Sequence, residues 1–357
     1  MAFKYKVAGI MSGTSLDGLD IALCRFEEQN NKWSFEVIGT STIPYTGEWK
    51  QRLAEAYHSD AVTLAQLHFD FGHYIGECVR EFCNEIDEEP DLISSHGHTI
   101  FHQPEKGFTF QVGSGAAIAA ASGIDTVCDL RATDVALGGQ GAPLVPIGDA
   151  QLFGGHRFCL NLGGIANISF DKGDLRVAFD ICPANMALNY LAEKTGLAFD
   201  EGGELAMSGN VLPDLLEQLN KLDFYQQTPP KSLGWEWFQQ HFLPLIDNDK
   251  LSVEDRMRTV VEHIGIQISN CLSLSPGTTM LTTGGGAYNN LLIDVISDQV
   301  SRHGIHVVVP ENQIVEFKEA IIFGFLGVLR ITDNFNSLAS VTGASFDSIG
   351  GAVYKGE

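Results

Sequence analysis

Glycine, hydroxyl and carboxylate residues gather near the start of the chain, where residues 13–20 read GTSLDGLD. Glycine lets backbone N–H groups approach a phosphate closely, and the hydroxyls of Thr14 and Ser15 can bind the same anion. Asp17 and Asp20 could orient a magnesium ion, because Mg²⁺ prefers carboxylate oxygens and retained water. A purely structural turn explains the same residues. The lysine of a Walker A loop is missing, so the segment predicts another kind of phosphate site.

Asp180 is the candidate for acid–base chemistry. It ends a predicted strand and precedes Pro183 and Asn185, so we expect its side chain to point into an active site. A phosphoryl-transfer enzyme needs such a carboxylate to take a proton from the nucleophile. A turn or cap role is the alternative, and three further acids near strand ends or loops compete with it: Asp129, Asp134 and Asp200.

Three consecutive glycines, Gly284, Gly285 and Gly286, lie between a predicted strand and a predicted helix. Without Cβ atoms a planar ring can lie against the backbone, and a helix N-terminus attracts anions. The three residues are therefore candidates for the adenosine side of a nucleotide site. A tight connection between strand and helix is the alternative.

Histidines at 96, 98 and 102 resemble a metal cluster, but their spacing is poor for one helix face and no nearby Cys or Glu completes a set. Hydrogen bonding to a substrate by His96, His98 and Thr99 is the better functional interpretation. Arg131 follows Asp129 and Leu130 and could grip a carboxylate or a phosphate with two parallel hydrogen bonds.

Two predicted hairpins position these residues. In each half of the chain a strand, a glycine-bearing turn, a return strand and a further strand precede a helix. The predicted strands are 6–11, 19–24 and 34–43 in the first half, and 157–162, 165–170 and 175–180 in the second. Later, strand 279–283 runs into the glycines and a helix from about residue 289. This layout is that of the actin/hexokinase-like architecture, in which nucleotide lies in a cleft between two lobes.

Composition bounds the class of protein. The chain has 357 residues, enough for two domains. It carries 45 acidic against 22 basic residues, a net charge of −23, which disfavours binding to nucleic acid and to anionic membranes. No signal-peptide pattern, no apolar stretch of about 20 residues and no CxxC pair among seven cysteines are present. A cytoplasmic protein that binds neither nucleic acid nor membrane is expected.

The motifs also resemble a known family, the anhydro-N-acetylmuramic acid kinases. These are actin/hexokinase-like (ribonuclease-H-like) sugar kinases of bacterial cell-wall recycling. The similarity runs in order through nearly the whole chain. Its segments are GIMSGTSLDGLD (9–20), SSHGHTIFHQP (94–104), DLRATDVALGGQGAPLVP (129–146), LNLGGIANIS (160–169), FDICPAN (179–185), FDEGGELAMSG (199–209), PPKSLGWE (229–236), GGGAYN (284–289), KEAIIFGFLG (318–327) and SVTGA (340–344).

The resemblance implies a two-domain α/β fold and an ATP-dependent reaction. Residues 1–128 with 338–357 would form an N-terminal lobe with the phosphate hairpin, and 129–337 a C-terminal lobe with the catalytic aspartate and the glycines. Members open 1,6-anhydro-N-acetylmuramic acid with water while O6 takes the γ-phosphoryl group. The product is N-acetylmuramic acid 6-phosphate. A homodimer, ATP with Mg²⁺, and a role in peptidoglycan recycling and amino-sugar catabolism are also implied.

The resemblance assigns roles residue by residue. Asp180 matches the catalytic base, and His96, Thr99, Arg131 and Glu319 look like substrate or active-site residues. The ATP phosphate segment comprises Gly13, Thr14, Ser15, Leu16, Asp17, Gly18, Leu19 and Asp20, with Asp17 and Asp20 as metal candidates.

Several motifs depart from the family pattern. FDICPAN stands where FDTGPGN is usual, HGHT where HGQT is usual, KSLGWE in place of KSTGRE, and QVGS in place of QxGD. These changes keep two alternatives open. The first is a weakly active or non-catalytic sensor of anhydro-sugars or muropeptides, and the second is a phosphatase or sugar hydrolase that needs no ATP.

Overall fold

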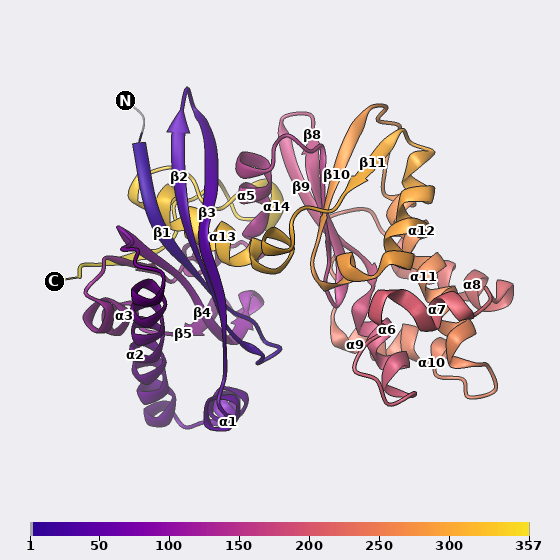
Figure 1. Cartoon of the computed structure of the whole chain (residues 1–357), viewed down its shortest axis with the longest axis horizontal. Helices are drawn as coiled ribbons and strands as arrows, with labels where there is room; N and C mark the ends of the chain where they lie inside the picture. Colours follow the sequence, from indigo (N-terminus) through magenta and orange to yellow (C-terminus); the bar gives the residue numbers. More distant parts are fainter. Residues whose placement is uncertain (1–2, 357) are drawn as a thin grey trace. The chain divides into compact units, whose positions relative to one another are not determined.

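The computed structural model describes residues 3–356, which form two compact units. One unit comprises residues up to 152 together with those from 317 onward, and the other comprises residues 153–316. Each unit contains one mixed sheet with helices packed on it (Figure 1).

The sheet of the first unit has the order β12-β6-β4-β1-β2-β3, with β5 paired to β4. β1, β2 and β3 form an antiparallel meander, whereas β4 runs parallel to β1 and β6 parallel to β4. The strands are β1 (Phe3–Ser12), β2 (Gly18–Gln29), β3 (Lys32–Pro44), β4 (Leu92–Gln103), β5 (Phe108–Val112), β6 (Thr126–Cys128) and β12 (Ala352–Tyr354).

Helices lie on both faces of this sheet. Ala8 and Ile10 of β1 pack in one core with Phe71 of α2, while Gly9, which points the other way, meets α13. A Cβ on Gly9 would lie 2.0 Å from the Ala320 carbonyl oxygen, so only glycine permits this approach. The helices are α1 (Gly47–Glu55), α2 (Ala61–Glu85), α3 (Gly115–Ser122), α4 (Ala132–Ala136), α5 (Val145–Leu152), α13 (Asn312–Ile331), α14 (Ala339–Thr342) and the short 3-10 helices η1 (Ala56–His58) and η2 (Pro104–Lys106).

The sheet of the second unit has the order β11-β10-β7-β8-β9. β7, β8 and β9 are antiparallel, and β10 and β11 continue the sheet in parallel beside β7. The strands are β7 (Phe158–Leu162), β8 (Ile165–Lys172), β9 (Leu175–Pro183), β10 (Thr278–Thr283) and β11 (Ile305–Val308).

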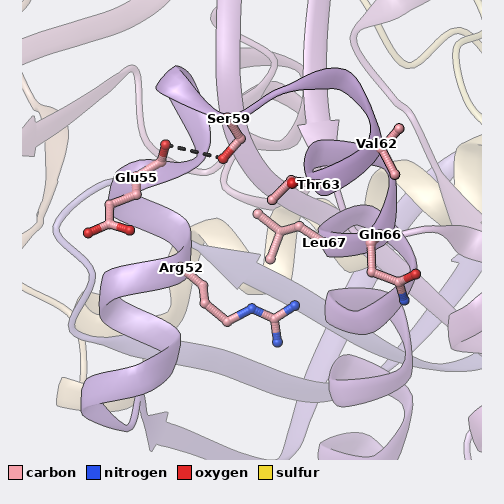
Figure 2. Close-up of a pocket in the computed structure, with 7 residues that line it drawn as sticks. All are labelled: Arg52, Glu55, Ser59, Val62, Thr63, Gln66 and Leu67. Carbon is pink, nitrogen blue, oxygen red and sulfur yellow. Dashed lines mark hydrogen bonds between the residues drawn. The ribbon is translucent and has the colours of Figure 1, made fainter.

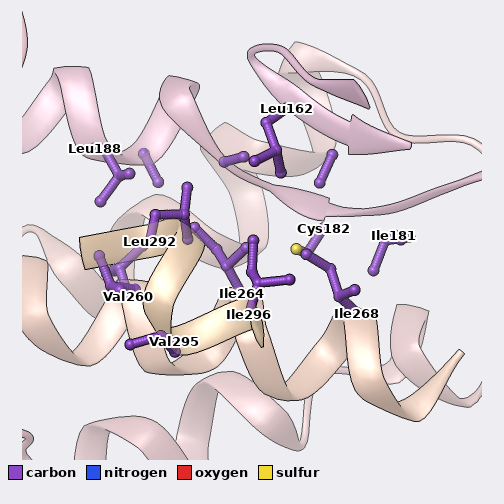
Figure 3. Packing of buried hydrophobic residues seen from close by; sticks show 14 of the residues in the cluster. Leu162, Ile181, Cys182, Leu188, Val260, Ile264, Ile268, Leu292, Val295 and Ile296 are labelled. Carbon is purple, nitrogen blue, oxygen red and sulfur yellow. The ribbon is translucent and has the colours of Figure 1, made fainter. Parts of the chain in front are cut away.

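The core of the second unit lies between this sheet and its two longest helices. Figure 3 shows buried side chains of α11 and α12 together with those of β7 and β9. The helical segments are α6 (Asn185–Glu193), η3 (Glu201–Gly203), α7 (Glu204–Ser208), α8 (Pro213–Asn220), η4 (Asp223–Gln226), α9 (Trp235–Trp237), the π-helix η5 (Phe238–Phe242), α10 (Leu243–Ile246), α11 (Val253–Asn270), η6 (Gly285–Tyr288) and α12 (Asn290–Ser301).

The two sheets repeat one topology. In both, the first three strands of the unit form a meander and the fourth joins in parallel beside the first. This is the ribonuclease-H-like arrangement, present twice, so the predicted actin/hexokinase-like α/β class is confirmed. Both predicted hairpins and the strand before the three glycines are also present.

The boundaries of the two compact units differ from those of the predicted lobes. The predicted N-terminal lobe was 1–128 with 338–357, and the predicted C-terminal lobe was 129–337. Residues 129–152 and 317–337 belong to the first unit. The physical reason is the close packing of α13 on β1 at Gly9 and Gly324, and on β4 at Gly327, where a Cβ would lie 2.5 Å from that of Ser94. Among the described residues no helix is long and apolar enough to span a membrane.

Candidate active site

The turn between β1 and β2 presents the predicted phosphate segment. Thr14, Ser15 and Asp17 are exposed, and the chain reverses through Leu16, whose φ is +60° and whose N–H bonds the Gly13 carbonyl at 3.3 Å. Gly18 must be glycine, because a Cβ there would lie 2.6 Å from the Ile43 carbonyl oxygen. The turn therefore has the exposed hydroxyls that a phosphate site needs, on a base fixed by β3.

A buried chain of hydrogen bonds holds Ser12, the last residue of β1 before this turn. Tyr45 donates its hydroxyl to Ser12 Oγ at 2.6 Å, and Ser12 lies 2.8 Å from His98 Nδ1. Burial lowers the pKa of His98 to about 4, so its ring is neutral at pH 7, and Nδ1 shares a hydrogen bond with the Ser12 hydroxyl. His98 is 4% exposed and bonds the strand that carries the turn, and its predicted contact with substrate stays a prediction. The sequence did not reveal that Ser12 and Tyr45 support the turn, since these two residues are 33 positions apart.

Asp20 lies on β2, just beyond the turn, where Thr42 donates to its Oδ1 at 2.6 Å. Asp17 is exposed in the turn itself. Among the described residues no group of three or more His, Cys, Asp or Glu side chains could hold a metal ion by itself. Two carboxylates in one short segment fit a magnesium ion that keeps most of its waters and arrives with a phosphate ligand.

Arg131 is held by two neighbours in the first unit. Its Nε donates to His96 Nε2 at 2.8 Å, and its Nη1 donates to the Gly141 carbonyl at 2.6 Å. Because Nε2 of His96 accepts, Nδ1 carries the proton and donates to the Gly97 carbonyl at 2.9 Å. Burial and the nearby Arg131 charge lower the pKa of His96, which keeps this ring neutral. His96 thus orients the guanidinium, and its predicted contact with substrate stays a prediction.

Glu319 of α13 belongs to the same group of charges. Loss of surrounding water raises the pKa of its carboxyl, although the residue keeps solvent exposure, and the positive charges of Arg131 and Lys318 oppose the rise. The negative charge of Asp20 raises the pKa of Glu319 further, so these two carboxylates are close enough to interact. Thr99 is half-buried on β4, where Gln111 Nε2 donates to its Oγ1 at 3.3 Å.

Asp180 lies on β9, the edge strand of the second sheet. The pairing with β8 shifts register just after it, between Ala166 and Asn167, and such a bulge re-aims side chains next to active sites. Its N–H donates to the Lys231 carbonyl at 3.1 Å, and its Oδ2 accepts the Leu233 N–H at 2.8 Å. Burial raises the pKa of the Asp180 carboxyl, and the Leu233 N–H partly offsets the rise.

Hydrogen bonding separates Asp180 from two of its three competitors. Asp134 is 1% exposed and accepts from Ser337, from Thr342 and from the Gly141 N–H, each at 2.7 Å. Asp200 caps α7 by accepting two backbone N–H groups. Asp129 has a φ of +56° and keeps solvent exposure, but loss of surrounding water at its carboxyl raises its pKa, and an Ala132 backbone hydrogen bond opposes the rise. The first two are structural acids, so they are poor candidates for a base.

The three glycines follow β10 as predicted. Gly284 has φ +83°, and a Cβ there would lie 2.6 Å from Asn161 Oδ1, while one on Gly286 would lie 2.7 Å from Leu162 Cβ. Tight packing on β7 thus explains two of the three. Around Gly285 the nearest atom to such a Cβ is 3.6 Å away. This residue alone leaves room for a ligand ring.

A surface cavity of about 400 Å³ opens between α1, η1 and α2 (Figure 2). Its arginine, Arg52, is already paired with Asp70, and Thr63 bonds the capping Asp60. None of the predicted site residues lines it. Those residues divide between the units: residues 13–20, His96, Thr99, Arg131 and Glu319 lie in the first, and Asp180 with the glycines in the second.

The sequence as a whole matches one family model, that of anhydro-N-acetylmuramic acid kinase, over residues 5–356. A relative of that name from Vibrio parahaemolyticus is 34% identical, with 99% of this chain and 100% of the relative covered. Another from Bacillus anthracis is 32% identical over 97% of this chain and 98% of the relative. The chain belongs to the anhydro-N-acetylmuramic acid kinase family. The family resemblance of the motifs is therefore confirmed, and with it the expectation of a phosphotransferase rather than a sensor.

Solved structures resemble this family member only remotely. A glucokinase from Streptomyces griseus in complex with glucose and AMPPNP has 11% identity and a TM-score of 0.40, with 90% of this chain and 98% of that chain covered. The activator of 2-hydroxyisocaproyl-CoA dehydratase from Clostridium difficile has 10% identity and a TM-score of 0.40, with 93% and 97% covered. The fold assignment rests on the strand order of the two sheets.

Proposed function

We propose that the protein uses ATP to convert 1,6-anhydro-N-acetylmuramic acid into N-acetylmuramic acid 6-phosphate. Water adds to the anomeric carbon, the bond from that carbon to O6 breaks, O6 bonds the γ-phosphorus, and ADP leaves. Sugar, ATP and water are thus consumed in equal numbers. The observation that carries the proposal is the state of Asp180, a half-buried carboxylate held by one backbone N–H on one oxygen.

Asp180 is proposed as the base that takes a proton from the attacking water. A carboxylate whose pKa is raised by burial accepts a proton more readily than an ordinary one, which suits a general base. The Leu233 N–H fixes the plane of the carboxylate, so that the other oxygen is directed at the water.

The turn of residues 13–20 is proposed to bind the ATP phosphates through its backbone N–H groups and the hydroxyls of Thr14 and Ser15. A magnesium ion bound with ATP neutralises phosphate charge. Asp17 and Asp20 would hold its waters. Gly285 is proposed to lie beside the adenine ring, because the backbone there leaves space.

Arg131, Glu319 and Thr99 are proposed to contact the sugar. The lactyl group of muramic acid carries a carboxylate, and the Arg131 guanidinium, already oriented by His96, suits two-point recognition of that group. A place in peptidoglycan recycling and amino-sugar catabolism, a cytoplasmic location and a homodimer belong to the proposal as properties implied by the family.

The test is phosphate transfer from ATP·Mg²⁺ to 1,6-anhydro-N-acetylmuramic acid, followed by mass spectrometry. The expected product is heavier than the sugar by one water and one phosphoryl group. Asp180→Asn keeps an oxygen for the Leu233 N–H but cannot take a proton, so turnover should fall at least about 10³-fold while ATP binding persists.

Asp174→Asn is the matched control, because Asp174 is an exposed acid in the turn before the same strand. Its turnover should equal that of the wild type. Tight binding of the sugar without any transfer at high enzyme concentration would instead support a sensor, and phosphate-free ring opening would support a hydrolase.

A further inference from the structure

A short segment, residues 231–233, lies beside Asp180 where the edge of the second sheet would otherwise be open. The carbonyl of Lys231, the first residue, accepts a hydrogen bond from the Asp180 N–H. The N–H of Leu233, the last residue, donates to the Asp180 carboxylate. Both bonds come from the backbone of a segment with no regular structure. The direction of the carboxylate therefore depends on whatever fixes this segment.

The Lys231 side chain ties the segment to η4. Its ammonium donates to the Phe224 carbonyl at 3.3 Å and lies 4.5 Å from the centre of the Phe224 ring. Phe224 is 3% exposed, so it is a firm support for the cation. The position of residues 231–233 thus follows that of η4.

The next residue, Tyr225, ties η4 to α11. Its hydroxyl lies 2.9 Å from Nε2 of His263, and Nδ1 of His263 lies 2.7 Å from Asn220 Oδ1 at the end of α8. Gln267 Nε2 also donates to that oxygen at 2.8 Å, so Asn220 accepts from both neighbours. His263 consequently carries its proton on Nδ1 and accepts the Tyr225 hydroxyl at Nε2. His263 is fully buried, so this arrangement is enclosed by protein.

We propose that Tyr225 and His263 are positioning residues for the reaction, because they hold η4 and, through Lys231, the backbone segment that directs the Asp180 carboxylate. This inference rests on the proposed function, in which Asp180 is the base. Neither residue touches the reacting atoms, and neither belongs to the motifs that match the family. Two hydrogen bonds, His263 to Tyr225 and Lys231 to the Phe224 carbonyl, connect the middle of α11 through η4 to residues 231–233. The backbone of that segment makes two further hydrogen bonds, both to Asp180.

The path has a signature in the pH dependence of turnover. Loss of the Leu233 N–H would raise the pKa of Asp180, so the acid limb of kcat would move to higher pH. The titratable groups that face the path are His263, Tyr225, Lys231, Cys182 and Cys271. Burial lowers the pKa of His263 to about 3 and raises the pKa values of the Tyr225 phenol and of the Cys182 and Cys271 thiols. None of them changes charge between about pH 4 and pH 7.

The experiment is Tyr225→Phe, which removes one hydroxyl and keeps the ring. We expect kcat to fall about 10-fold, KM for ATP to stay within about twofold, and the acid limb of kcat to shift upward. Tyr190→Phe is the matched control, because the Tyr190 hydroxyl bonds the surface pair of Lys194 and Asp247 in the same unit. Hydrogen exchange at the Leu233 amide should become faster only in Tyr225→Phe.

Unchanged kcat and an unchanged acid limb in Tyr225→Phe would overturn the inference, as would an equal loss in Tyr190→Phe. His263→Gln is a second variant that breaks the same link from the other side, and it should reproduce the shift. If the wild type transfers no phosphate, the proposed function fails, and the Leu233 exchange rate alone decides: faster exchange supports the path, and an unchanged rate refutes it.

Discussion

At the scale of single residues, the Asp180 carboxylate combines burial with weak hydrogen bonding, unlike the acids Asp134 and Asp200. Asp134 and Asp200 each accept two or more hydrogen bonds and hold elements together. Asp180 accepts one backbone N–H, and its pKa is raised by burial. An acid kept in this state is costly for the fold and useful for proton transfer.

That cost predicts a gain of stability in the inactive variant. Since burial raises the pKa of Asp180 in the folded protein, this carboxyl lowers the stability of the fold at pH values above the ordinary aspartate pKa, pH 7 included. Asp180→Asn removes the charge and should raise Tm at pH 7 by about 2 °C. The difference should shrink as the pH is lowered below about 3.9, the ordinary pKa of an aspartate, because the wild-type carboxyl then becomes protonated in both states. A variant that melts below the wild type at pH 7 would contradict this account.

The sequence predicted the strand that carries Asp180 and the turn that carries Thr14 and Ser15, because local patterns determine both. The predicted strand end at Asp180 was wrong, since β9 continues to Pro183. It could not separate Asp180 from Asp134, since the partners of Asp134 are Ser337 and Thr342, about 200 positions away. The bond of His98 to Ser12 could not be predicted for the same reason, because the two residues are 86 positions apart. Hydrogen bonds between distant residues carry no sequence pattern.

At the scale of secondary-structure elements, a buried ion pair joins α5 to α13. Lys318 Nζ lies 2.7 Å from Asp149 Oδ1, and both side chains are almost fully buried. Each helix lies where the chain passes from one compact unit to the other, at residues 152–153 and 316–317. Lys318 also precedes Glu319, so the pair fixes the helix turn that presents a proposed substrate residue.

Breaking this pair should destabilise the first unit. Asp149→Asn leaves a buried ammonium without its counter-charge, and we expect the free energy of unfolding to fall by about 3 kcal/mol. The double variant Asp149→Leu/Lys318→Met replaces both charges by apolar groups and should recover most of the loss. Urea denaturation of the three proteins measures both effects. Equal losses in the single and double variants would show that packing, not charge, matters here.

The strands of both meanders, the strand before the three glycines and the helix after them could be predicted from alternation and glycine turns. The lobe boundaries could not. They depend on the approach of α13 to β1, which requires Gly9 and Gly324 to meet across more than 300 positions. A single glycine within a strand does not reveal which helix will pack on it.

At the scale of the whole molecule, acidic residues outnumber basic ones by 45 to 22. Like charges spread over a compact protein repel one another and lower its stability, and salt screens this repulsion. Raising NaCl from about 20 to about 300 mM at pH 7 should therefore raise Tm by about 2–3 °C. KCl should act equally, because general screening does not depend on the cation. No response, or a response to one cation only, would contradict this explanation.

The edge position of β9 has a consequence for solubility as well as for catalysis. An uncovered edge strand presents unpaired N–H and carbonyl groups that can add a strand from another molecule. Residues 231–233 occupy such groups at Asp180, so the segment that directs the base also shields the margin of the sheet. Variants that release it should lose colloidal stability together with turnover. Selection for active enzyme would then also act against self-association.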